Sequence, residues 1–148
     1  MKKRILSPPI LLSVWILFIF TRSLQPADLS ASESQWVLDL IQSILPFQIS
    51  LHFVRKSAHF IEFAMLGVLA HLTFRDITQK WLFSFLFTVM FGISVALCDE
   101  TIQLFVSGRT GQIQDVWLDA AGAFTGVLTM ISIYKLWNKR NCLIITRI

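Results

Sequence analysis

Four long apolar stretches constrain the fold of this 148-residue chain more than any other feature. A helix needs about 20 mostly apolar residues to cross a hydrocarbon core of roughly 30 Å. The stretches that meet this requirement cover residues 5–21, 57–74, 81–98 and 115–134. We interpret the first as a span rather than a cleaved signal peptide, because no small-x-small cleavage site follows it. The sequence therefore predicts an all-α integral membrane protein, a four-helix bundle that forms a single domain over residues 1–148.

Composition supports a membrane protein and excludes several other classes. The chain is 55% hydrophobic and 15% charged, with a mean hydropathy of +0.66, whereas soluble domains are about half apolar and a quarter charged. The 13 Lys and Arg residues outnumber the 9 Asp and Glu residues, but the excess lies near the two ends of the chain and not on a helix face that could follow phosphates. These values exclude a disordered chain and a nucleic-acid partner, and two cysteines exclude a disulfide scaffold.

The distribution of Lys and Arg predicts the orientation in the membrane, because inner loops carry the excess of positive charge. With both termini inside, the inner side holds Lys2, Lys3, Arg4, Arg75, Lys80, Lys135, Lys139, Arg140 and Arg147. The outer side then holds only Arg22, Arg55, Lys56 and Arg109. The sequence therefore predicts an N-in, C-in topology.

The outer connection between the first two spans, residues 23–56, is long enough to hold a helix of its own. Apolar residues recur there at positions 37, 40, 41, 44 and 45, which is a helical period. We expect Ser32 or Ser34 to cap this helix and Pro46 to end it. The pattern predicts a short amphipathic helix lying on the outer membrane surface.

Polar side chains gather at the outer ends of the last three predicted spans. At 100° per residue, each span carries its polar residues within one sector of the helix surface. Ionisable groups next to lipid are costly, so we expect the three polar stripes to face one another and to pair. The simplest packing gives an outward-facing polar pocket. Its predicted lining consists of Lys56, His59, Glu62, Asp99, Glu100, Gln103, Arg109, Asp115 and Asp119.

Four of these residues, His59, Glu62, Glu100 and Asp115, are candidates for chemistry. His59 and Glu62 are three residues apart, so they could share a metal ion, act as an acid–base pair or form a structural hydrogen-bond cluster. Asp115 and Asp119 are four residues apart, and we expect a cation or a proton between them. An oxygen-rich set with one or two histidines suits Mg²⁺ or Mn²⁺ better than a structural Zn²⁺, and no other cofactor is predicted.

Arg109 follows Gly108 in the tight outer turn between the last two spans. We expect its guanidinium to clamp Asp99 or Glu100, because arginine forms bidentate pairs with carboxylates. Glu100 itself could serve as a general base or a cation ligand. His71 lies near the inner end of its span without a charged companion, and we expect it at the membrane interface.

Gly122 and Gly126 form a GxxxG motif in the last span. Small residues at this spacing let a neighbouring helix backbone approach closely. Because the two glycines share a face with Asp115 and Asp119, we favour packing within the chain, and the alternative is a homodimer face.

Three motifs together resemble a known family. They read Lys56-x-x-His59-Phe60-x-Glu62-Phe63-x-x-Leu66, then Glu100-x-x-Gln103-x-Phe105-x-x-Gly108-Arg109, then Asp115 with Gly122 and Gly126. In this order they resemble the VanZ-like family of small bacterial integral membrane proteins, over roughly residues 10–137. That family usually has Asn where Asp119 stands, and often has paired serines where this chain has Thr21-Arg22-Ser23. The resemblance implies a multi-pass protein of the bacterial plasma membrane, and the founding member is associated with low-level teicoplanin resistance.

Two functions fit this pattern best. The first is a cell-envelope protein that binds an amphiphile, either a lipoglycopeptide or a cell-wall lipid, in the outward-facing pocket and contributes to glycopeptide resistance. The second is a membrane enzyme that acts on a lipid-linked head group through Glu62, His59, Glu100 and Asp115. A proton- or cation-coupled carrier is less favoured, because the inner halves of the spans lack polar residues and no inverted repeat is present.

Overall fold

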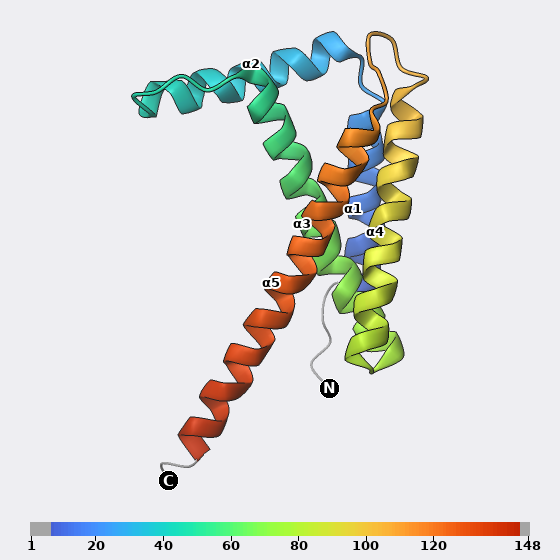
Figure 1. The fold of residues 1–148 in the computed structure, drawn as a ribbon, viewed down its shortest axis with the longest axis vertical. Helices are drawn as coiled ribbons and strands as arrows, with labels where there is room; N and C mark the ends of the chain where they lie inside the picture. Colours follow the sequence, from blue (N-terminus) through green and yellow to red (C-terminus); the bar gives the residue numbers. More distant parts are fainter. Residues whose placement is uncertain (1–6, 146–148) are drawn as a thin grey trace.

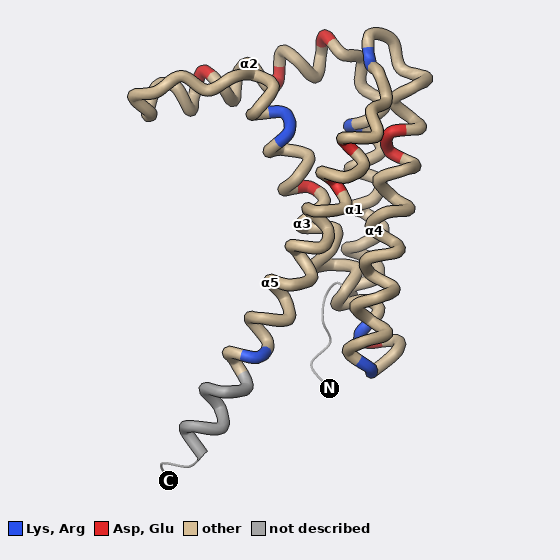
Figure 2. The backbone as a smooth tube through the Cα atoms, in the orientation of Figure 1, with Lys and Arg blue, Asp and Glu red and all other residues tan. Residues whose placement is uncertain are grey.

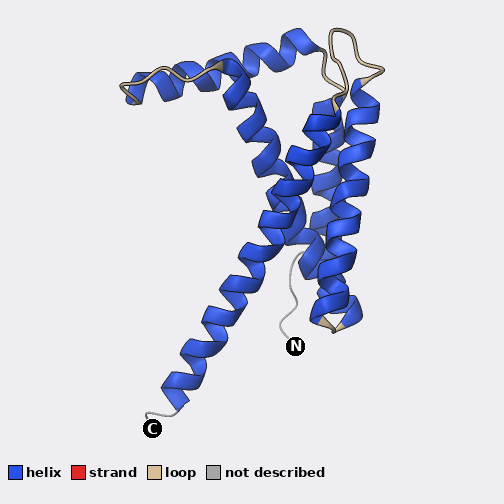
Figure 3. Cartoon of the chain, viewed as in Figure 1, coloured by secondary structure: helices blue, strands red, loops and turns tan. Residues whose placement is uncertain are grey.

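A computed structural model describes the backbone of residues 7–145 and the side chains of residues 7–137. This part of the chain folds into helices and contains no strand (Figure 3). The helices are α1 (Pro8–Ser23), α2 (Ala27–Ile44), α3 (Leu51–Thr78), α4 (Trp81–Gln103) and α5 (Ile113–Ile145). The predicted all-α fold is therefore confirmed for the described residues.

Three helices are long and apolar enough to cross a membrane, namely α3, α4 and the Ile113–Trp137 part of α5. α1 has 16 residues and is only about 24 Å long at 1.5 Å per residue, which is shorter than a typical span. A fourth candidate span arises only if α1 and α2 are counted together, and these two helices meet at an angle of 108°. The structure thus supports a membrane protein with three or four spans.

Residues 5 and 6 of the first predicted span lie outside the described residues, as do Lys2, Lys3, Arg4 and Arg147, on which the predicted orientation partly rests. The side chains of Lys139 and Arg140 also lie outside them. The N-in, C-in topology therefore stays a prediction.

The helix in the outer connection, α2, lies across one end of the bundle (Figure 1). It begins at Ala27, directly after Pro26, so the expectation that Ser32 or Ser34 caps it is wrong. Pro26 is the residue before the first turn, and its carbonyl accepts the N–H of Ser30. The two serine hydroxyls instead donate to the carbonyls of the residues three and four positions before them. The helix ends two residues before Pro46, as expected. Its position on a membrane surface stays a prediction.

α3 and α5 cross at very close range, because glycines lie at the crossing. A Cβ atom added to Gly67 would lie 2.1 Å from the carbonyl oxygen of Ala123, and one added to Gly126 would lie 1.9 Å from that of Ala64. Gly122 faces the carbonyl of Phe60 in the same way, at 2.5 Å. The GxxxG motif thus packs inside the chain, as the sequence favours, and a homodimer through the same face stays a prediction.

The hydrophobic core lies between α1, α3, α4 and α5. Its buried members come from all four helices and are Leu12, Ile19, Phe63, Leu66, Ala70, Val95, Ala96 and Val116. α1 packs against both α3 and α4, and the indole Nε1 of Trp15 donates to the carbonyl oxygen of Glu62 at 2.9 Å. The core therefore fixes the depth of α1 relative to the polar end of α3.

His71 is buried within the bundle, with 1% of its surface exposed. Its depth relative to the membrane interface stays a prediction. Its Nδ1 lies 3.0 Å from the hydroxyl oxygen of Ser84 on α4, and its ring lies 5.5 Å from that of Trp81. The tight turn between α3 and α4, in which Gln79 has a positive φ of 55°, brings these residues against His71.

Candidate functional site

A polar cluster lies at the end of the bundle next to α2. Figure 2 shows that most acidic residues of α3, α4 and α5 gather in this half of the bundle, whereas Asp76 lies near the opposite end of α3. α1 and α4 end here and α3 and α5 begin here, so the alternating direction of the helices brings distant polar residues together. Ser23 of α1, Asp99 of α4 and Asp119 of α5 are at most 2% exposed, and the side chain of His59 on α3 is 19% exposed.

Asp99 lies at the centre of a hydrogen-bond network that joins α1, α4 and the start of α5. The hydroxyl of Ser23 donates to Oδ1 of Asp99, and the amide Nε2 of Gln103 donates to its Oδ2 at 2.9 Å. The same amide lies 3.2 Å from Oε1 of Glu100, whose Oε2 accepts the backbone N–H of Gln112 at 2.7 Å. Neutral donors therefore hold both carboxylates of α4.

Asp119 has no such donors. Neither of its carboxylate oxygens has a hydrogen-bond partner, and neither does Nδ1 of His59, which lies 3.8 Å from Oδ1 of Asp119. One ligand atom from each of His59, Asp99 and Asp119 lies within 4.8 Å of the other two. Among the described residues this is the one group of histidine, cysteine and acidic side chains with such a spacing, and it does not include Glu62.

Lys56 and Asp115 form an ion pair between α3 and α5, with side chains that are 24% and 20% exposed. The cation beside Asp115 is thus a lysine. Asp119, one turn further along α5, has no lysine or arginine paired with it within the described residues, and its nearest basic group is the imidazole of His59 at 3.8 Å. The two aspartates therefore differ in their partners despite their spacing on one helix face.

Arg109 does not clamp a carboxylate, contrary to the expectation from the sequence. Its Nε donates to the carbonyl oxygen of Gln25 at 2.8 Å, and one terminal nitrogen donates to that of Arg22 at 3.2 Å. Arg22 lies in the last turn of α1, and Gln25 lies in the connection to α2. Carbonyls in and just after the last turn lack partners within the helix, and a guanidinium can bind two of them. Burial and the nearby charge of Arg55 lower the pKa of Arg109. Arg109 thus fixes the turn after α1.

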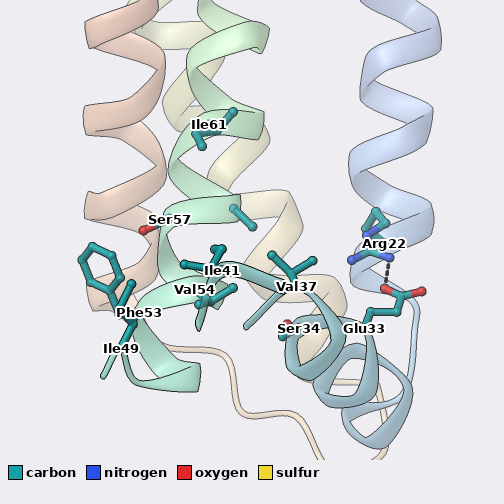
Figure 4. A pocket seen from close by; sticks show the side chains of 11 residues that line it. Arg22, Glu33, Ser34, Val37, Ile41, Ile49, Phe53, Val54, Ser57 and Ile61 are labelled. Atoms are coloured by element: carbon teal, nitrogen blue, oxygen red, sulfur yellow. Dashed lines mark hydrogen bonds and ion pairs between the residues drawn. The ribbon is translucent and has the colours of Figure 1, made fainter. Parts of the chain in front are cut away.

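Two hollows adjoin each other beside this cluster. A cavity of about 30 Å³ is lined mainly by polar residues, namely Arg22, Ser30, Ser34, Arg55, Ala58, His59, Glu62 and Arg109. A larger apolar groove of about 260 Å³ lies between α2 and α3 (Figure 4). Arg22, Ser34 and Ala58 line both hollows, so the apolar groove leads directly to the polar cavity. An ion pair between Arg22 and Glu33 joins α1 to α2 at the boundary, as Figure 4 shows.

The predicted pocket residues therefore fall into separate groups. His59, Asp99 and Asp119 lie together, Lys56 pairs with Asp115, and Glu62 lines the polar cavity. Glu100 and Gln103 belong to the network around Asp99, whereas Arg109 binds backbone carbonyls.

Sequence reasoning missed Ser23, the hydroxyl donor to Asp99, and the backbone N–H of Gln112, which binds Glu100. A signal for Ser23 was present, since the family that the chain resembles often has paired serines at that point. The backbone N–H of Gln112 could not be found in this way, because nearly every residue carries such a donor whatever its side chain.

No curated protein and no solved structure that was compared with the chain matches it. A family model described as VanZ/LLP1 matches residues 9–137. This match covers nearly the whole chain and includes every helix that contributes to the polar cluster. The chain therefore belongs to the VanZ/LLP1 family.

Proposed function

We propose that this chain is a multi-pass protein of the bacterial plasma membrane that binds an amphiphile at the outer leaflet. The ligand is a lipoglycopeptide or a cell-wall lipid, and its binding contributes to glycopeptide resistance. The observation that carries the proposal is the junction of an apolar groove with a charged cavity, which share Arg22, Ser34 and Ala58 as lining residues.

The groove suits an acyl chain. α2 contributes Val37 and Ile41 to it, and α3 contributes Phe53, Val54 and Ile61. Its volume of about 260 Å³ is slightly below the range for drug-sized ligands, which is about 300–1,000 Å³, and suits a single narrow chain. Val37, Phe53 and Ile61 are exposed, and large exposed apolar side chains mark surfaces that contact lipid or a ligand. We infer that one alkyl chain lies here, between the two helices.

The adjoining cavity suits an anionic head group. Three arginines, Arg22, Arg55 and Arg109, line it, together with a single acidic side chain, that of Glu62. Arg22 and Arg109 already have partners, whereas Arg55 makes no hydrogen bond or ion pair within the described residues. Guanidinium groups bind carboxylates and phosphates with two parallel hydrogen bonds. Arg55 is therefore the residue that contacts the head group.

A binding experiment with matched variants tests this assignment. The purified full-length protein in lipid nanodiscs is titrated with teicoplanin and with undecaprenyl phosphate, and binding is followed by tryptophan fluorescence. For whichever of the two probes the wild type binds, we expect Phe53→Glu to weaken binding at least tenfold. Arg55→Gln should weaken it by a similar factor. Ile77→Glu, at an exposed apolar position near the other end of α3, serves as the control and should bind as the wild type does.

Failure to bind either probe, or equal loss of binding in the Ile77 control, would contradict the proposal. The resistance role is checked separately in cells that produce equal amounts of each variant. Phe53→Glu should lower the teicoplanin concentration that stops growth, and unchanged growth inhibition would remove the resistance role.

A membrane enzyme acting on a lipid-linked head group is the second candidate, through Glu62, His59, Glu100 and Asp115. One observation favours it, since His59 and Glu62 line the same cavity as the arginines, where a base would lie beside a bound head group. Envelope lipids of cells with the wild type and with Glu62→Gln distinguish the two functions. A substrate that accumulates in the Glu62→Gln cells indicates an enzyme, whereas identical lipid profiles indicate a binding protein.

A further inference from the structure

We propose that His59, Asp99 and Asp119 bind one divalent metal ion of the Mn²⁺ or Zn²⁺ class where α3, α4 and α5 meet. The proposal does not depend on the amphiphile, because Asp99 and Asp119 do not line the polar cavity and only His59 does. It assigns a role to Asp119, which the polar network around Asp99 leaves without a partner.

The spacing of the three side chains suits a metal ion. A cation about 2.1 Å from each ligand atom can join two atoms that are up to about 4.2 Å apart. Nδ1 of His59 and Oδ1 of Asp119 lie 3.8 Å apart, inside that limit. Ligand atoms of all three residues lie within 4.8 Å of one another, so side-chain shifts of about 0.6 Å or less bring every pair within reach of one ion. Each residue belongs to a different helix, so only the folded bundle presents the site.

The burial of Asp119 is the second and independent observation. Its side chain is fully buried, and both carboxylate oxygens lack a hydrogen-bond partner. A buried carboxylate without a partner is strongly unfavourable. Two neighbouring protein cations are engaged elsewhere, since Lys56 pairs with Asp115 and Arg109 binds backbone carbonyls. A third, Arg55, lines the polar cavity but makes no hydrogen bond or ion pair with Asp119. The partner that Asp119 lacks is therefore a cation from solution.

The surroundings of Asp99 match those of a metal ligand. Ser23 and Gln103 each donate a hydrogen bond to its carboxylate and so fix its orientation. Outer hydrogen bonds of this kind orient the ligating side chains in metal sites. His59 also lines the polar cavity and is 19% exposed, which gives an ion a route from solvent.

The ligand chemistry selects the class of metal. One imidazole nitrogen with two carboxylates suits Mn²⁺ or Zn²⁺, whereas Ca²⁺ and Mg²⁺ favour sets made only of oxygen. This choice keeps Mn²⁺ from the sequence-based expectation but replaces Mg²⁺ with Zn²⁺, because only three side chains, one of them an imidazole, come together. The competing explanation is a proton on Asp119, which would neutralise the carboxylate without any metal.

The test uses purified full-length protein in detergent, stripped with EDTA and titrated with Mn²⁺. Electron paramagnetic resonance follows the free ion, and circular dichroism confirms that each sample is folded. We expect one Mn²⁺ per chain, displaced by Zn²⁺ but not by an equal concentration of Ca²⁺. The pulsed spectrum of the bound ion should show coupling to the ¹⁴N nucleus of an imidazole, and this coupling should be absent in His59→Gln.

Two aspartate variants complete the design. Asp119→Asn keeps the shape of the side chain but removes its charge, and should weaken Mn²⁺ binding at least 100-fold. Asp115→Asn, one turn away and outside the triad, should bind Mn²⁺ within threefold of the wild type. Mn²⁺ should raise the melting temperature of the wild type and of Asp115→Asn but not that of Asp119→Asn.

Three results would overturn the proposal. The first is the absence of saturable Mn²⁺ and Zn²⁺ binding by the folded, EDTA-stripped wild type. That result would mean that a proton, and not a metal ion, neutralises Asp119. The second is bound Mn²⁺ without nitrogen coupling. The third is equal loss of binding in the two aspartate variants, which would place the ion elsewhere in the acidic cluster.

Discussion

Replacing the glycines at the crossing of α3 and α5 by alanine should destabilise the protein in a graded order. A carbon–oxygen contact is ordinarily about 3.3 Å. A Cβ atom on residue 126 would lie 1.9 Å from the carbonyl oxygen of Ala64, and one on residue 122 would lie 2.5 Å from that of Phe60. The helices must therefore separate by about 1.4 Å for Gly126→Ala and by about 0.8 Å for Gly122→Ala to restore that contact distance.

The magnitude follows from two opposing effects. Alanine is a better helix former than glycine by roughly 0.5–1 kcal/mol, whereas overpacking a tight interface costs about 1–3 kcal/mol. The clash involves backbone atoms, which cannot move aside as a side chain does, so the cost dominates. We expect a net loss of about 2 kcal/mol for Gly126→Ala and about 1 kcal/mol for Gly122→Ala, which is a factor of about 5–30 in the unfolding equilibrium.

Reversible unfolding in mixed detergent and SDS micelles, followed by tryptophan fluorescence, measures these values. Thr125→Leu adds more bulk at an exposed position between the two glycines and should change stability by less than about 0.5 kcal/mol. The reasoning would be refuted if both glycine variants were as stable as the wild type. It would also be refuted if Gly122→Ala lowered the free energy of unfolding more than Gly126→Ala does. Gly122 lies closer to Asp119 in sequence, so Gly122→Ala should nevertheless weaken Mn²⁺ binding more than Gly126→Ala does.

Two further substitutions test the polar contacts. Ser23→Ala removes a donor to buried Asp99 and should lower the free energy of unfolding by about 1.5–3 kcal/mol, measured by the same assay. A loss below about 0.5 kcal/mol would mean that the hydroxyl does not stabilise the carboxylate. Arg109→Gln removes the hydrogen bonds to the carbonyls of Arg22 and Gln25 and should speed proteolysis in the turn between α1 and α2 several-fold. Cleavage at the wild-type rate would show that the guanidinium does not stabilise this turn.

The sequence is informative about the helices but less so about their ends. Apolar length and composition predict α3, α4 and α5, because a run of lipid-compatible residues has few other structures available. They also favour α1 as an independent span, yet it has only 16 residues and turns sharply at Pro26. The start of α2 was misplaced because serines are frequent cap residues, whereas the residue at the actual N-cap position is Pro26.

Convergence of polar residues could be predicted, whereas their pairing could not. Helical periodicity places His59, Asp99 and Asp119 on inward faces, and the structure brings them together. Periodicity does not give the rotation or depth of one helix relative to another. The sequence-based expectation therefore grouped His59 with Glu62 and Arg109 with a carboxylate, and the structure gives both residues other neighbours. The actual partner of Arg109 is a set of backbone carbonyls, which residue types do not reveal.

The hydrogen bond between Ser23 and Asp99 has a consequence for how the chain enters a bilayer. Synthesis runs from the N-terminus, so Ser23 and the amide of Gln103 are both present before α5 leaves the ribosome. Asp99 therefore meets its donors as soon as α4 docks on α1. Asp119 is synthesised last and packs against α3 and α4 after these helices have associated. Docking of α5 is therefore the step that completes the cluster.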